Sequence, residues 1–155
     1  MTRDYQAELQ NAFDVARTDN SLPSLIACDC LGTLFRFEDG KVDQDLVDFL
    51  ILMHRRGYGV TVLSSDPRDV NHHALYRAGL PRELCVVQEK FKVYSSGRTF
   101  GILIDDDAGL AGGLSCLHLW NPGNIHFKAF VRETLAAAGN PRHRPAPPAG
   151  SQTPF

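Results

Sequence analysis

Five short apolar segments alternate along this chain with segments of helical periodicity, and this alternation restricts the folds open to it. The apolar segments are residues 25–29, 60–63, 85–87, 100–104 and 115–119, and the helical ones are residues 43–56, 67–78 and 126–138. Strands that alternate with helices form βαβ units, which build a parallel sheet with right-handed crossovers. We therefore predict an α/β fold with a five-stranded parallel sheet.

The predicted domain occupies residues 1–140. In residues 3–17, apolar side chains recur at steps of three and four, as on the buried face of an amphipathic helix. Residues 24–138 form the predicted core of the domain. Residues 141–155 contain five of the nine prolines and no periodic apolar face. This composition predicts a disordered tail, so deletion of residues 142–155 should be tolerated.

The length and charge of the chain exclude several classes of protein. A chain of 155 residues can bury one core but not two ordinary ones. Its 16 basic and 18 acidic residues do not give the strongly basic surface of a duplex nucleic acid binder. It has neither an apolar run that could span a bilayer nor a signal peptide, so we expect a soluble, cytoplasmic protein. Its four cysteines lack a CxxC pair and are expected to be buried, reduced thiols.

Polar residues stand at the ends of three predicted strands. Asp29 ends the first, Ser64 follows the second, and Asp105 and Asp106 follow the fourth. The carboxyl ends of parallel strands meet at one edge of a sheet, where α/β proteins bind their ligands. A carboxylate there is costly to desolvate unless it has a metal, a hydrogen-bond donor or a catalytic role. The alternative is that Asp29 caps a turn and that the acids at 105–107 form a solvated loop.

Three of these segments resemble motifs of the haloacid dehalogenase-like (HAD) superfamily. Residues 25–35 (LIACDCLGTLF) resemble its first motif, residues 60–64 (VTVLS) its second, and residues 102–106 (ILIDD) its fourth. The resemblance covers about residues 24–138 and implies a three-layer, Rossmann-like domain whose sheet has the order 5-4-1-2-3. Residues 35–42, in which apolar and polar residues alternate up to an Asp-Gly turn, would form a hairpin flap beside the site.

The resemblance also implies a metal site and a nucleophile. Asp29 would attack phosphorus to give an aspartyl-phosphate. Mg²⁺ would be held by Asp29, by the main-chain carbonyl of Leu31 and by Asp106, with Asp105 nearby, since this ion prefers hard oxygen ligands. Ser64 would donate a hydrogen bond to a phosphoryl oxygen.

The same resemblance assigns further residues to the phosphate group. Gly32, Thr33 and Ser65 would contribute to substrate binding. The third motif supplies a lysine, and both Lys90 and Lys92 lie in the segment between the third and fourth predicted strands. We favour Lys90, while a solvated surface position is the alternative for either lysine.

Position 31 departs from the family pattern. Phosphatases of this family carry there a second acid, which protonates the leaving group and then activates water, whereas this chain has Leu31. Loss of a general acid/base lowers rates by roughly 10²- to 10⁴-fold. Dehalogenase and phosphonatase branches lack this acid but need an inserted cap domain. Only 34 residues separate Asp29 from Ser64 and 40 separate Ser64 from Asp105, which leaves no room for a cap.

These observations predict a small, capless, HAD-like magnesium-dependent hydrolase of the phosphatase type. Its substrate would carry an exposed phosphate, and the open site would admit macromolecular substrates. Because position 31 is leucine, turnover would be slow. The main alternative is a catalytically inactive binding or regulatory module. Dehalogenase-like chemistry and a site completed by another subunit also stay open, as does the oligomeric state.

Overall fold

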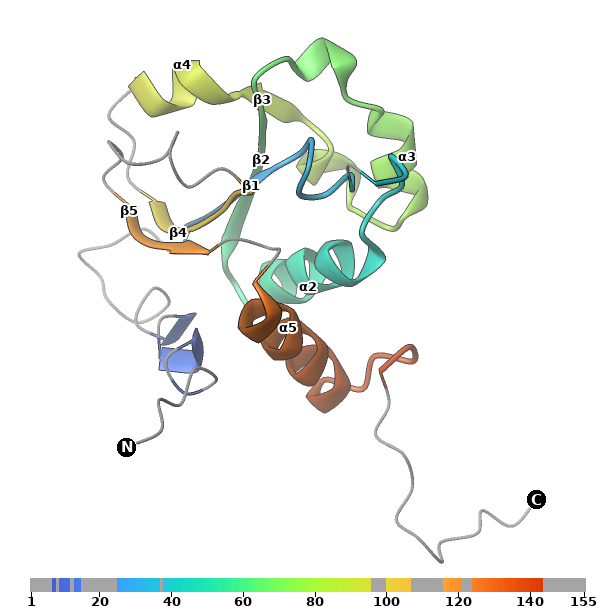
Figure 1. The fold of residues 1–155 in the computed structure, drawn as a ribbon, viewed down its shortest axis with the longest axis vertical. Coiled ribbons are helices and arrows are strands. Elements are labelled where there is room, and N and C mark those ends of the chain that lie inside the picture. The colour runs from blue at the N-terminus through green and yellow to red at the C-terminus, as the bar shows by residue number, and fades with distance from the viewer. Residues whose placement is uncertain are drawn as a thin grey trace, which may run out of the picture.

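The structure of the protein is a computed structural model, and it describes residues 7, 9–11, 13–14, 25–36, 38–95, 100–106, 116–120 and 124–143. It confirms an α/β fold built on a parallel sheet (Figure 1). The outer parts of the predicted helix 3–17 and the chain after residue 143 lie outside the described residues.

The sheet is made of strands that all run in the same direction. These are β1 (Leu25–Asp29), β2 (Gly59–Ser64), β3 (Val87–Glu89), β4 (Phe100–Ile104) and β5 (Cys116–Trp120), in the order β3-β2-β1-β4-β5. β1 is central, and its Ile26 pairs with Val60 of β2 on one side and with Ile102 of β4 on the other. Burial on both faces explains why β1 and β4 read as continuous apolar runs. The carboxyl ends of all these strands therefore point to one edge of the sheet.

Several of the helices begin at capping side chains. The helices are α2 (Gln44–Arg55), α3 (His72–Arg77), α4 (Lys90–Ser95), α5 (Ile125–Ala137) and the 3₁₀ turns η1 (Pro67–Asp69) and η2 (Arg82–Leu84). Asp43 caps α2 and Asn124 caps α5 by accepting hydrogen bonds from main-chain amides of the first turn. None of the helices within the described residues is long and apolar enough to cross a membrane.

The structure differs from the prediction in three elements. The helix predicted for residues 67–78 is divided into η1 and α3, because Asn71 accepts a hydrogen bond from the Ala74 amide and starts a new helix. The third strand begins at Val87 rather than Cys85, since the Cys85 amide still closes η2 by bonding to Arg82. Helix α4, directly after β3, was not predicted at all.

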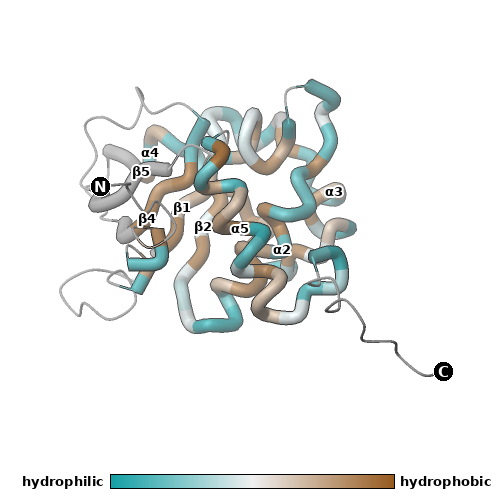
Figure 2. The backbone as a smooth tube through the Cα atoms, turned by 60° about the horizontal axis from the view of Figure 1, so that its bottom comes forward, coloured by the Kyte–Doolittle hydropathy of each residue, from teal (hydrophilic) through white to brown (hydrophobic). Residues whose placement is uncertain are grey.

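The core on one face of the sheet is aromatic. α2 and α5 lie side by side there (Figure 1), and the rings of Phe13, Phe49, Phe127 and Phe130 pack with centroids 5.3–6.1 Å apart. The Tyr58 hydroxyl donates a 2.6 Å hydrogen bond to the main-chain carbonyl of Phe13, which ties the N-terminal helical residues to the start of β2. Figure 2 shows hydrophobic residues along β1 and β4, with hydrophilic turns at the periphery.

The state of the described cysteines agrees with the prediction of buried, reduced thiols. Cys28, Cys30 and Cys85 are buried and form no disulfide, as predicted, while the side chain of Cys116 lies outside the described residues. Burial raises the pKa of Cys30 to about 12, with a smaller contribution from the nearby Asp29 charge. These three thiols therefore stay protonated at neutral pH and act as small core residues.

The predicted hairpin at residues 35–42 is reduced to a small flap. A single antiparallel bridge joins Phe35 to Val42, and the chain turns at Gly40, whose φ is +69°. Asp39 stabilises this turn, because its carboxylate accepts hydrogen bonds from the Lys41 amide and the Arg36 guanidinium. Residue 37 is outside the described part of the chain.

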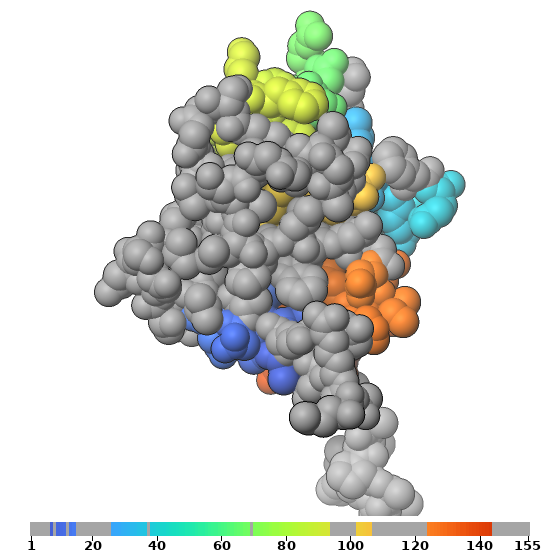
Figure 3. Space-filling model, turned by 60° about the vertical axis from the view of Figure 1, so that its left-hand side comes forward, coloured from blue at the N-terminus to red at the C-terminus, as the bar shows by residue number. Residues whose placement is uncertain are grey.

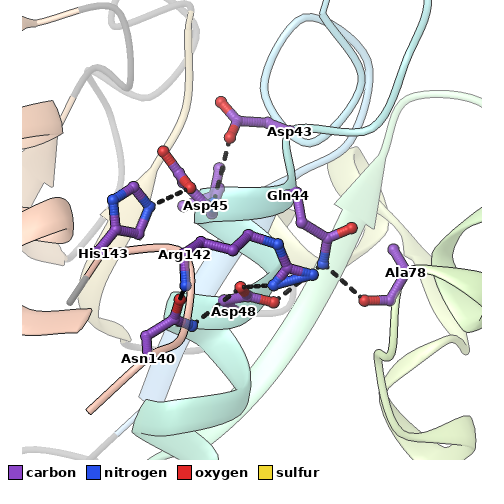
Figure 4. A network of polar contacts seen from close by, with 9 residues as sticks. Asp43, Gln44, Asp45, Asp48, Ala78, Asn140, Arg142 and His143 are labelled. Atoms are coloured by element: carbon purple, nitrogen blue, oxygen red, sulfur yellow. Dashed lines mark hydrogen bonds and ion pairs between the residues drawn. The ribbon is translucent and has the colours of Figure 1, made fainter. Parts of the chain in front are cut away.

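The segment that follows α5 contacts α2 through polar side chains, some of which lie past residue 140 (Figure 4). Arg142 Nη1 lies 2.7 Å from Asp48 Oδ2, and His143 Nε2 lies 2.6 Å from Asp45 Oδ1. These contacts involve two residues past the domain boundary that we predict at residue 140, and the boundary itself stays a prediction. Acidic residues in the first half of α2 attract the basic side chains of Arg142 and His143. This attraction could not be predicted from the proline content of residues 141–155.

We expect a chain that ends at residue 141 to be less stable than one that ends at residue 143. The difference in stability between these two chains measures the contacts of Arg142 and His143. Because both side chains are partly exposed, their ion pairs together contribute only about 1 kcal/mol. Thermal unfolding should show a midpoint about 3 °C lower for the shorter chain. Equal midpoints would contradict this role of the two residues.

Candidate active site

The sheet brings the expected polar residues to one edge. Asp29 ends β1, Ser64 ends β2, Lys90 follows β3, and Asp105 follows β4. All four side chains are buried, and Asp105 has no exposed surface. In Figure 3, as in Figure 1, α4 (yellow-green) and the segment that follows β2 (green) lie at the same end of the molecule.

Lys90 joins two of the carboxylates. Its Nζ lies 2.7 Å from Asp29 Oδ1 and 2.9 Å from Asp105 Oδ2, as the first residue of α4. Lys92 is exposed, and its main-chain amide donates to the Glu89 carboxylate. Of the two lysines that the sequence left open, the structure therefore places Lys90 at the carboxylates.

Thr33 connects Asp29 to Asp106. Its hydroxyl Oγ1 lies 3.2 Å from Asp29 Oδ2 and 3.4 Å from Asp106 Oδ1, so it can donate its one proton to either carboxylate. Gly32 makes this placement possible, because its φ of +83° turns the chain in a region that other residues rarely adopt. The Thr33 amide in turn donates to the carbonyl of Cys30.

The buried carboxylates strongly affect one another's protonation. Burial raises the pKa of Asp29 to about 7; the hydrogen bond from Lys90 opposes this rise, while Asp106 and Asp105 add to it. The Lys90 pKa is also raised: burial alone would lower it, but its hydrogen bonds to Asp29 and Asp105 favour the ammonium more strongly. At neutral pH, Asp29 can therefore gain or lose a proton while Lys90 stays charged.

The donor set fits a hard divalent cation. One carboxylate oxygen from each of Asp29, Asp105 and Asp106 lies within 4.8 Å of the others, so this acidic triad could hold a metal ion. When all are ionised, these three carboxylates and the Lys90 ammonium together carry two negative charges, which a divalent cation would balance. The fourth ligand implied by the resemblance, the main-chain carbonyl of Leu31, stays a prediction.

We expect Asp106→Asn to weaken Mg²⁺ binding by at least about tenfold. Loss of a residue that only supports a metal ligand already lowers metal affinity by about that much, and Asp106 is expected to be a ligand itself. Asp105→Asn should have the smaller effect on affinity, because Asp105 is buried against Lys90.

The affinity for Mg²⁺ should also rise from pH 6 to pH 8, because Asp29, with its pKa of about 7, loses its proton over this range. Titration calorimetry would measure both effects, and a larger loss in Asp105→Asn would overturn this assignment of the ligands.

Leu31, two residues after Asp29 in the chain, lines an open groove. Its side chain is 40% exposed, and the groove has a volume of about 540 Å³. The groove runs between the flap and the start of α3, with Leu31, Gly32, Phe35, Arg36, Gly40, Lys41, Val42, Asn71 and Ala74 lining it. The sequence did not identify Lys41 or Asn71 as site residues. The alternating pattern of the flap was the signal for Lys41, whereas nothing in the sequence pointed to Asn71.

The two serines at the end of β2, Ser64 and Ser65, have different environments. Ser64 is buried, and its hydroxyl oxygen accepts a 3.2 Å hydrogen bond from the Asp66 amide. Ser65 is exposed. The phosphate contacts that we expect for Ser64, Ser65 and Gly32 stay predictions. No protein-family model, curated protein or solved structure matches this chain, so the site is interpreted from its own geometry.

Proposed function

We propose that this protein is a capless, magnesium-dependent phosphohydrolase of the HAD type, with Asp29 as the nucleophile. The proposal includes a Rossmann-like sheet of order 5-4-1-2-3, with which the strand pairing agrees. One observation carries it: the ammonium of Lys90 contacts Asp29 and Asp105 at the edge where four strands end. A buried acidic cluster with one fixed cation is suited to receive a phosphoryl group and a divalent ion.

In the proposed reaction, the Asp29 carboxylate attacks phosphorus in line with the bond that breaks. Lys90 fixes the orientation of the carboxylate through its 2.7 Å contact, and Thr33 contacts the other carboxylate oxygen. Mg²⁺ held by Asp29 and Asp106 would neutralise charge on the transferring group. Ser64 lies at the end of β2, where its hydroxyl would donate to a phosphoryl oxygen. The ester oxygen of the substrate leaves with the electron pair and takes a proton from solvent. Water then attacks phosphorus, the bond from phosphorus to Asp29 breaks, and phosphate is released while Asp29 returns to a carboxylate.

The groove supports a substrate whose phosphate is exposed. Leu31, two residues after Asp29 in the chain, lines this groove together with the flap, and its volume of about 540 Å³ could hold the rest of a substrate. We propose that phosphate groups on macromolecules are among its substrates, because an open groove sets no limit on the size of the leaving group. The cytoplasm is the compartment that we propose for this activity.

A binding or regulatory module without turnover is the second candidate. It is favoured by Leu31, a residue that cannot transfer protons, at the mouth of the groove. In that case, the acidic triad would bind an ion or a phosphorylated partner, and Asp29 would transfer no phosphoryl group. The two candidates differ in whether restoring an acid at position 31 restores catalysis.

We expect Leu31→Asp to raise magnesium-dependent hydrolysis of p-nitrophenyl phosphate by about tenfold, less than a fully evolved acid/base contributes. Leu31 is 40% exposed, so a carboxylate there stays hydrated and the protein should still fold. Leu31→Asn is the matched control, because it is similarly polar but transfers no proton. If Leu31→Asp folds, binds Mg²⁺ and gains nothing over Leu31→Asn, the binding module becomes the better account.

A further inference from the structure

The groove between the flap and the start of α3 has the size and the lining of a small-molecule site. Its volume of about 540 Å³ lies within the range of roughly 300–1,000 Å³ that such sites occupy. Its apolar lining comes from Leu31, Phe35, Val42 and Ala74. Because Leu31 is 40% exposed, an apolar group that covered it would remove this surface from water, which is favourable. The groove therefore favours a ligand with an apolar body.

The charged groups of the groove are positive. None of the described residues that line it is acidic, while Arg36 and Lys41 contribute two cations. The Arg36 guanidinium is paired with Asp39, at 2.8 Å between Nη2 and Oδ2, so its charge is balanced within the flap. Asp39 also accepts a hydrogen bond from the main-chain amide of Lys41, but no described residue forms an ion pair with the Lys41 ammonium. Lys41 is therefore the cation of the groove that a ligand can use.

Asn71 adds a neutral hydrogen-bond donor to the lining. Its side-chain oxygen Oδ1 accepts a 3.1 Å hydrogen bond from the Ala74 amide, which determines the end of the side-chain amide that faces the helix. The NH₂ end donates no hydrogen bond to a described residue and is left as a donor for a ligand. The Lys41 ammonium can likewise only donate. Both polar groups therefore suit a ligand that carries acceptor oxygens.

We propose that this groove binds a small organic anion, whose apolar body lies over Leu31 and whose carboxylate or other oxyanion group pairs with Lys41. The sign of the ligand's charge follows from complementarity, since Lys41 has no acidic neighbour among the described lining residues. A cationic ligand would be repelled by the same ammonium. The inference goes beyond the proposed function, because binding in the groove does not require that Asp29 transfers a phosphoryl group.

The test compares two fluorescent probes that share one apolar body. Anilinonaphthalene sulfonate is anionic, whereas phenylnaphthylamine has the same ring system without the sulfonate and is neutral. Fluorescence titration of the whole protein at neutral pH gives the dissociation constant of each probe for the wild type, for Lys41→Gln and for Leu31→Ala. Lys92→Gln is the matched control, because it removes an exposed lysine of α4 that does not line the groove.

We expect Lys41→Gln to weaken binding of the anionic probe by at least about threefold, as is typical of an exposed charge pair, without weakening the neutral probe. Leu31→Ala should weaken the anionic probe by about threefold as well, because it removes apolar contact area. Lys92→Gln should bind as the wild type does. If Lys41→Gln bound the anionic probe as tightly as Lys92→Gln, or lost affinity for both probes equally, the inference would be wrong. Absence of binding of the anionic probe to the wild type, or unchanged affinity in Leu31→Ala, would also overturn it.

Discussion

Asp29→Asn should lower magnesium-dependent hydrolysis of p-nitrophenyl phosphate by at least about 10³-fold, because removal of a catalytic nucleophile has effects of this size or larger. The amide keeps the shape of the side chain at the end of β1 but is a poor nucleophile. The substitution also removes one of the three carboxylates of the acidic triad. Initial rates at saturating Mg²⁺ would measure the loss of activity separately from the loss of metal affinity.

The control for this prediction is Asp14→Asn. Asp14 is an exposed residue of the N-terminal helical segment, next to Phe13, which contacts Tyr58 near the amino ends of the strands. This variant should keep the activity of the wild type. If Asp29→Asn retained more than about a tenth of that activity, Asp29 would not be the nucleophile.

Lys90→Met should destabilise the protein by about 3–5 kcal/mol, because removing one partner of a buried ion pair leaves the other charges unneutralised. Lys90 contacts two buried carboxylates, so both Asp29 and Asp105 lose their ammonium partner. The loss should be greater at pH 8 than at pH 5, since at lower pH these carboxyls can take up protons. Denaturant unfolding at the two pH values would measure it.

Two variants control for the loss of packing at position 90. Lys92→Met makes the same change at an exposed position of α4 and should alter stability by less than about 0.5 kcal/mol. Asp29→Asn combined with Lys90→Met should be more stable than Lys90→Met alone, because one unneutralised charge is removed. If the double variant were the less stable of the two, the ion pairs would not be the reason for the loss.

The strands with buried faces were predictable from the sequence. β1 and β4 are apolar runs followed by acids, and the structure places Asp29 and Asp105 at adjacent strand ends. The parallel arrangement follows from the alternation of strands with helices. The convergence of Asp29, Ser64 and Asp105 at one edge could therefore be inferred before any coordinates were known.

The contacts that define the candidate site could not be predicted in the same way. Lys90 reaches Asp105 across a sequence separation of 15 residues, and this contact depends on α4, which spans only six residues. Such a short helix leaves too little periodicity to detect. Asn71, a residue type common at helix caps, was the signal for the division between η1 and α3. It was missed because the other residues of 67–78 favoured one continuous helix.

The exposure of Leu31 depends on the turn that follows β1. A leucine two residues after a buried strand suggests an apolar contact with the flap, yet Gly32 turns the chain so that the side chain stays 40% exposed. This position makes Leu31→Asp a clean test, because the new carboxylate would be hydrated. Residues of the flap line the same groove as Leu31, so a carboxylate at position 31 would face this groove.

The most direct test of the account is to locate a phosphoryl group on Asp29. The protein is incubated with acetyl phosphate with and without Mg²⁺, quenched in acid and reduced with borohydride, which converts an acyl phosphate side chain to an alcohol. Peptide mass spectrometry then identifies the modified residue. We predict modification at Asp29 that requires Mg²⁺ and is absent from Asp29→Asn. Modification at another residue, or none with Mg²⁺ present, would contradict the assignment of Asp29 as the nucleophile.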